Sequence, residues 1–215
     1  SNYGKTAPYL AAKSGYRPLP AATVTADSDL TFYNGTGGFS ADGKEYVITT
    51  TKQHTAPMPW INVLANENFG TIISENGQGY TWSENSHEHR LTPWQNDPVS
   101  DTGGEAFYIR DEDTGWYWSP CTALSQKHAS YTIRHGFGYT VFEHIEDGIQ
   151  TKMYVYVDTE DAIKFNLIKI KNLSNKVRNL TVTGYAEWVL GDLREKHAMY
   201  MNSELDLETG ALLAQ

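Results

Sequence analysis

The stretch YTIRHGFGYTVFEHIEDGIQTKMYVYVD, residues 131–158, decides the fold class. It is rich in β-branched and aromatic residues, which favour strands because they pack well on a pleated surface. It is interrupted at Asp147-Gly148, a residue pair typical of two-residue hairpin turns, in which the backbone must adopt positive φ. We therefore predict two or three antiparallel strands in this stretch.

Turn signals of the same kind recur along the chain. Asp42-Gly43 precedes an expected strand at 45–50, Asn76-Gly77 marks a hairpin, and an acidic turn ending at Gly115 separates two further strands. Residues 162–190 are interpreted as one long hairpin that turns near Ser174-Asn175. Few segments have helical periodicity, and residues 192–201 are too short and polar to assign. The pattern predicts an all-β fold, an antiparallel β-sandwich.

The last expected strand alternates clearly. An alternation of period two places Leu180, Val182, Ala186 and Trp188 on one face and Thr181, Thr183, Tyr185 and Glu187 on the other.

The two ends of the chain differ in character from this β pattern. Residues 1–29 contain three prolines and no clear period, and are interpreted as an extended arm or linker before a sandwich domain at 30–215. At the other end, the turn Glu208-Thr209-Gly210 precedes the apolar segment ALLAQ, which we expect to be an unpaired strand. This predicts that the chain is the N-terminal fragment of a larger enzyme.

Composition excludes several classes of partner. With a formal net charge of −9 and a pI near 5.2, the chain lacks the basic surface that nucleic acids and anionic membranes require. No apolar run approaches the ~20 residues of a membrane-spanning helix. The single cysteine, Cys121, precludes an internal disulfide. The 14 Tyr and 6 Trp suit partly wet surfaces that bind sugars or proteins, although all-β folds are aromatic-rich in any case.

Residues 80–101, YTWSENSHEHRLTPWQNDPVSD, gather the densest polar and aromatic chemistry, and we call them the polar loop. His87 and His89 have the spacing of two metal ligands on one face of a strand, but no further ligands follow at a recognisable spacing. We therefore expect no metal site. Cys121 and His128 lack a nucleophile signature, and the glycines at 35–38 precede a strand instead of the helix that a phosphate loop requires.

Carbohydrate chemistry is the remaining possibility for the polar loop. Glycosidic reactions use paired carboxylates, and this region supplies Glu84, Glu88, Asp97, Asp101 and Glu105. Trp82 and Trp94 have the ring faces that stack on pyranoses, and Arg90 can bind hydroxyl groups. The alternative is structural: Pro93, Asn96, Asp97 and Pro98 fix turns, and Arg90 binds backbone carbonyls. The residues alone leave both interpretations open.

Several segments resemble, in order and spacing, the N-terminal part of glycoside hydrolase family 94, formerly glycosyltransferase family 36. The resemblance covers about residue 31 to the end and is nearest to the β-1,2-glucan branch of the family. The segments that carry it are FYNGTGGFSADGKEYVI (32–48), TAPMPWINVLANENFG and the residues that follow it to Asp101 (55–101), RHGFGYTVFEH (134–144), YAEWVLGDLREK (185–196) and LETGALLA (207–214).

The resemblance implies a galactose mutarotase-like β-supersandwich that precedes an (α/α)6 barrel. It also implies inverting phosphorolysis or synthesis of β-glucosidic bonds, with inorganic phosphate or glucose 1-phosphate as co-substrate of the parent enzyme and no other cofactor. Because the family's catalytic acid belongs to the barrel, we expect no catalytic residue in this chain and no activity from it alone. The implied partners are a β-glucan oligosaccharide, the barrel and a second subunit. The implied location is cytoplasmic, at the cytoplasmic side of the inner membrane if the parent is a membrane-bound glucan synthase, without direct membrane contact by this domain.

The resemblance also points to residues near the substrate. In the family, a loop after the late strands approaches the neighbouring subunit's active site, and here it corresponds to Gly191–Ser203. Arg194, His197 and Tyr200 are the choices within it, beside Trp82, Arg90 and Trp94 of the polar loop. Two other classes of function remain open: a free-standing carbohydrate-binding module and a purely structural interaction domain.

Overall fold

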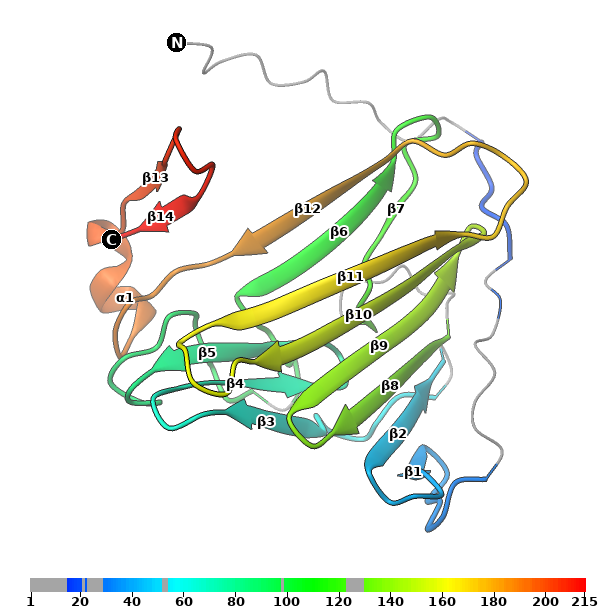
Figure 1. Ribbon diagram of the computed structural model, residues 1–215, viewed down its shortest axis with the longest axis horizontal. Helices are drawn as coiled ribbons and strands as arrows, with labels where there is room; N and C mark the ends of the chain where they lie inside the picture. The colour runs from blue at the N-terminus through cyan, green and yellow to red at the C-terminus, as the bar shows by residue number, and fades with distance from the viewer. Residues whose placement is uncertain (1–14, 21, 23–28, 52–53, 98, 123–129) are drawn as a thin grey trace.

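The computed structural model describes the chain apart from residues 1–14, 21, 23–28, 52–53, 98 and 123–129. Its described part is built from antiparallel sheets, as predicted (Figure 1). The largest sheet has six strands in the order β1-β2-β8-β9-β10-β11. These strands are β1 (Gly37–Phe39), β2 (Glu45–Thr50), β8 (Tyr131–Gly136), β9 (Tyr139–Glu146), β10 (Ile149–Val157) and β11 (Lys164–Asn172).

Smaller sheets complete the sandwich. One has the order β3-β4-β5, another has the order β12-β6-β7, and a hairpin of β13 and β14 ends the chain. The bounds are β3 (Ile61–Ala65), β4 (Phe69–Ser74), β5 (Gly79–Ser83), β6 (Glu105–Asp111), β7 (Tyr117–Trp118), β12 (Leu180–Ala186), β13 (Ser203–Leu205) and β14 (Leu212–Ala214). The short helices α1 (Arg194–His197) and η2 (Ala198–Tyr200) lie in the segment that the sequence left unassigned.

The turns that the sequence marks are confirmed. Asp147 and Gly148 have φ of 48° and 75°, and they join β9 to β10 with Glu146 opposite Ile149. Asn76-Gly77 likewise joins β4 to β5. Gly77 has φ of 81°, and a Cβ at this position would lie 2.4 Å from the Cβ of Cys121, so only glycine fits.

The core lies between the six-stranded sheet and the β3-β4-β5 sheet. Period-two alternation along β10 buries Met153 and Val155, which pack with Phe142 of β9. From the opposite layer, Leu64 and Ile73 complete the same cluster. Phe142 is fully buried, and its truncation to alanine would cost about 3–5 kcal/mol. This core holds the β3-β4-β5 sheet in place, and the polar loop begins in its last strand, β5.

The predicted long hairpin at 162–190 is wrong. β11 pairs with β10, whereas β12 crosses to another sheet and pairs with β6. Arg178, in the connection, stabilises the crossing: its guanidinium binds Asp111 at the end of β6 and Asp147 in the β9–β10 turn. Contacts between residues distant in sequence therefore hold this crossing connection in place.

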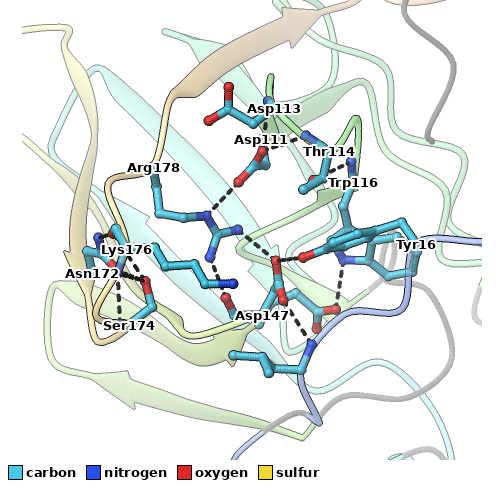
Figure 2. Close-up of polar contacts among 12 residues, drawn as sticks. Tyr16, Asp111, Asp113, Thr114, Trp116, Asp147, Asn172, Ser174, Lys176 and Arg178 are labelled. Carbon is cyan, nitrogen blue, oxygen red and sulfur yellow. Dashed lines mark hydrogen bonds and ion pairs between the residues drawn. The ribbon is translucent and has the colours of Figure 1, made fainter.

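Figure 2 shows the network around Arg178, which also holds part of the N-terminal arm. Arg178 Nε lies 2.6 Å from Asp111 Oδ2, and Nη2 lies 2.6 Å from Asp147 Oδ2. The Tyr16 hydroxyl donates to Asp147 Oδ2 at 2.6 Å, and the Leu19 N–H donates to Oδ1 at 2.8 Å. The described segment 15–20 of the arm is thus anchored on the sandwich.

The C-terminal segment corrects a second expectation. ALLAQ is paired: its strand β14 pairs with β13, with Leu212 opposite Leu205 and Ala214 opposite Ser203. The hairpin remains exposed nevertheless: Leu212 and Leu213 retain 74% and 52% of their accessible surface. Strand β12 is also exposed on both faces between residues 181 and 185, so its alternation does not produce a buried side.

Candidate functional site

The structure brings the polar loop and the segment 191–200 together. Arg90 and Gly191 exchange two backbone hydrogen bonds, of 3.1 Å from the Arg90 N–H and 3.0 Å from the Gly191 N–H. The Arg90 Nη1 group also donates to the carbonyl of Asp192 at 3.2 Å. Arg90 and Asp192 are 102 positions apart in the sequence. The two groups of residues predicted to approach substrate therefore meet at one corner of the molecule. Sequence spacing gave no sign of this contact.

Within the polar loop, Trp94 is held by a neighbouring ring. Tyr80 stacks on Trp94 with a centroid distance of 4.9 Å and an interplanar angle of 11°. The Arg90 guanidinium carbon lies 5.8 Å from the Tyr80 ring centroid and 6.0 Å from the Trp94 ring centroid. Burial raises the pKa of Tyr80, whose hydroxyl donates to the carbonyl of Ser86. Trp94 is therefore preorganised, and it keeps 36% of its surface exposed.

Trp82 occupies a different environment. Its indole covers Gly70 on the neighbouring strand, where a Cβ would lie 2.4 Å from Trp82 Cζ2. The side chain is half-buried, and its ring centroid is 5.3 Å from that of Tyr80. This placement explains the glycine at position 70 by close packing. A contact between Trp82 and a sugar stays a prediction.

The three residues chosen in 191–200 are spread along a short surface segment. Arg194 forms an ion pair with Glu187, and its side chain is 54% exposed. The His197 ring covers Gly191 and its Nε2 lies 3.1 Å from Asp192 Oδ1. Hydrogen bonds from Lys196 and then His197 hold the pKa of Asp192 well below its usual range. Tyr200 is 75% exposed, so its side chain is free to contact a partner.

Several of the histidines have structural contacts in this chain. His87 pairs with its neighbour Glu88 at 2.7 Å on the surface. His135 and His144 are bound to the backbone carbonyls of Trp60 and Ser130, and burial lowers the pKa of His135 to about 4. His128 lies outside the described residues. In the described part of the chain, no three His, Cys, Asp or Glu side chains gather as metal ligands.

An apolar cleft of about 420 Å³ lies beside this corner, and the sequence gave no signal for it. Its walls include Phe107, Tyr185 and Trp188, and Leu212 of the terminal hairpin borders it. Segments distant in the chain supply these residues, which is why no local motif reveals the cleft.

The cleft has a polar floor. Lys164 Nζ lies 2.6 Å from Glu105 Oε2 and 3.0 Å from the hydroxyl of Thr71. Thr81 and Thr92 donate to the other oxygen of Glu105, at 2.6 Å and 2.9 Å. Burial alone would raise the pKa of Glu105, but Lys164 and the threonine hydroxyls outweigh it and lower the pKa. Glu105 is therefore an ionised, fully engaged carboxylate.

On the other side of the polar loop, Trp94 borders a second, mixed polar and apolar groove of about 240 Å³. Asp97 and Asp101 reach its rim. Of the acidic residues that the sequence offered for sugar chemistry, these two line a groove, and Glu105 lies at the floor of the cleft.

These antiparallel layers define the chain as a β-supersandwich domain. The sequence profile described as "Glycosyl hydrolase 94, supersandwich domain" matches residues 44–215, and the chain therefore belongs to glycoside hydrolase family 94.

Curated relatives agree with this assignment. The chain is 41% identical over 187 residues, 86% of its length, to the cyclic beta-(1,2)-glucan synthase NdvB of Rhizobium meliloti (strain 1021). It is 34% identical over 174 residues, 78% of its length, to the N,N'-diacetylchitobiose phosphorylase of Vibrio proteolyticus. It is 30% identical over 147 residues, 68% of its length, to the 3-O-beta-D-glucopyranosyl-beta-D-glucuronide phosphorylase of Paenibacillus borealis. The chain spans only 7%, 21% and 18% of these relatives' lengths. No described helix is long and apolar enough to cross a membrane.

Proposed function

We propose that the chain is the supersandwich domain of an enzyme that synthesises or phosphorolyses β-glucosidic bonds in β-1,2-glucan. The 41% identity to a protein named a cyclic beta-(1,2)-glucan synthase, beside lower identities to phosphorylases, supports this substrate class. Inorganic phosphate or glucose 1-phosphate would serve the parent enzyme as co-substrate.

The engagement of the buried carboxylates supports a catalytic acid located in the barrel of the parent enzyme. Glu105 is paired with Lys164, and Asp111 and Asp147 are paired with Arg178. Burial raises the pKa of Glu75 to about 6, but this side chain is 2% exposed and accepts a hydrogen bond from the Trp60 N–H. None of these four is presented to a ligand as a general acid requires.

The uncovered region around β12 carries the proposed docking role. Tyr185 on β12 is 55% exposed, and Leu212, which lines the apolar cleft with it, is 74% exposed. Val182, on the other face of β12, is 46% exposed. A sheet normally buries one face against another layer, and contiguous apolar surface of this kind marks an interaction site. We infer that the (α/α)6 barrel packs over β12, the terminal hairpin and the apolar cleft.

Co-purification of the 215-residue chain with a separately expressed barrel tests this docking. Tyr185→Asp should abolish co-elution, because it places a charge in the apolar interface. Phe137→Asp is the matched control, because Phe137 is 84% exposed on the β8–β9 turn, away from the cleft. Equal binding by both variants would contradict the docking proposal. Phosphate-dependent release of glucose 1-phosphate by the 215 residues alone would contradict the assignment of catalysis to the barrel.

The segment 191–200 supports a further role in a homodimer. Leu193, Met199 and Tyr200 are 47%, 79% and 75% exposed on this one short segment. We infer that it contacts the second subunit and frames the substrate pocket there, with Arg194 and His197 beside it. In the full-length enzyme, Met199→Asp should shift the mass measured by light scattering from dimer towards monomer. An unchanged mass would exclude this contact.

A further inference from the structure

The groove beside Trp94 is lined by both apolar and polar residues. Leu64 of β3 and Ile73 of β4 point into the core. Because side chains alternate along a strand, Ile61 and Ile72 face outwards, an odd number of positions away. Ile61 and Ile72 line the groove with Met58, and Trp94 borders it. Such a combination of C–H surface, an aromatic ring and polar groups matches the amphipathic faces of a sugar ring.

Gln78 supplies an independent sign of a ligand. It lines the groove and is only 6% exposed. Its backbone N–H donates to Ser74 Oγ, but its side-chain amide has no hydrogen-bond partner among the described residues. The amide nitrogen and oxygen are not among the sealed, unpartnered side-chain atoms of the described residues, so they are open to a ligand, and a bound hydroxyl group would supply the hydrogen bond that the protein does not. Gly103 makes room for this amide, because a Cβ there would lie 2.7 Å from Gln78 Oε1.

The charges at the groove disfavour an anionic ligand. Asp97 and Asp101 line it, and no Lys or Arg does among the described residues. Asp101 Oδ2 accepts from Ser74 and Asn76, and Asp97 accepts from Ser100, so both carboxylates are fixed in place as acceptors. The volume of about 240 Å³ is below the ~300 Å³ at which pockets for drug-sized ligands begin. One ring fits, and the rest of a chain would extend into solvent.

The geometry points to a carbohydrate subsite in the Trp94 groove, which binds one neutral hexopyranosyl unit of a glucan chain. Trp94 contacts the ring face, Gln78 binds a hydroxyl group with its amide, and the two aspartates accept hydrogen bonds from hydroxyl groups. Only the choice of glucan rests on the proposed function; the preference for a sugar without negative charge follows from the groove itself.

Titration of the 215-residue chain with a β-1,2-linked glucooligosaccharide tests the subsite by calorimetry and by NMR. The Trp94 indole N–H and the Gln78 side-chain NH₂ signals should shift in the unmodified chain. Trp94→Ala and Gln78→Leu should each weaken binding by about tenfold, the size expected when an aromatic contact or a hydrogen bond is lost. Phe137→Ala, which removes an exposed aromatic ring elsewhere, should bind as the unmodified chain does. Glucose 1-phosphate should not compete at the groove, because the aspartates repel its phosphate.

The outcomes separate this subsite from the docking proposal. No binding by the chain, or NMR shifts confined to residues outside the groove, would overturn the subsite, whether or not the barrel binds. Binding that survives both groove variants would overturn it as well. Loss of barrel binding with Trp94→Ala, without any oligosaccharide binding, would instead identify the groove as a protein contact. Near-UV circular dichroism of both variants establishes that they are folded, and the NMR shifts of the unmodified chain need no variant.

Discussion

Replacing Arg178 with methionine should destabilise the domain more than the loss of an exposed ion pair would. The Arg178 side chain is 10% exposed, and each of its two carboxylate partners is 1% exposed. Removing one member of a buried ion pair typically costs about 3–5 kcal/mol, because the remaining charge is left uncompensated. Tyr16 still donates to Asp147, and the backbone N–H groups of Asp113 and Thr114 still donate to Asp111. We therefore expect about 3 kcal/mol, the lower end of the range.

Urea denaturation followed by tryptophan fluorescence measures this loss, and thermal melting should show a decrease in Tm of about 6–12 °C for a domain of this size. Arg194→Met is the matched control, since Arg194 is 54% exposed in its pair with Glu187 and should cost at most about 1 kcal/mol. Although burial opposes it, the hydrogen bond from Arg178 helps to lower the pKa of Asp111 below its ordinary 3.8. The stability from this lowered pKa is present above pH 3.8 and is lost as the pH falls further, so the difference between Arg178→Met and the unmodified domain should shrink in acid. Equal losses for the two variants at pH 7 would refute the reasoning.

Three further predictions, with four substitutions, test other parts of the structure. Glu75→Gln should stabilise the domain by about 2 kcal/mol at pH 8 and have no such effect below pH 4.5. Burial raises the folded-state pKa of Glu75 from 4.5 to about 6. Ionisation of Glu75 therefore destabilises the folded state as the pH rises through that interval. Melting curves at both pH values check this, and a gain that is the same at pH 4 would contradict it. Gly70→Ala should cost about 1–3 kcal/mol and shift the tryptophan emission, because the new Cβ meets Trp82 at 2.4 Å; an unchanged melting temperature would count against this packing. In the full-length enzyme, Arg90→Ala and Trp94→Ala should each lower kcat/KM by about tenfold, and unchanged folding, assembly and kinetics would show that the polar loop is only surface.

Local signals were sufficient for the turns and for most strands. Positive φ at Asp147, Gly148 and Gly77 is a property of single residues, and the sequence displays it directly. The β-branched and aromatic residues on either side of that turn located β9 and β10 in the same local way. The prediction failed at β12, where proximity in sequence suggested a hairpin with β11. Its true partner is β6, and the ion pairs of Arg178 that favour this choice join residues 31 and 67 positions apart.

The sequence by itself determined the all-β class, the hairpin turns and the family, because each depends on short motifs or on their order along the chain. Only the tertiary structure decided which candidate residues meet. It brought Arg90 into hydrogen-bond contact with Gly191, stacked Tyr80 on Trp94, and placed Gln78 in the lining of a groove. It also placed Glu105 beside Lys164 and so changed a candidate catalytic carboxylate into a structural one. The physical reason is that these contacts depend on strand order and burial, which arise when distant segments pack around one core.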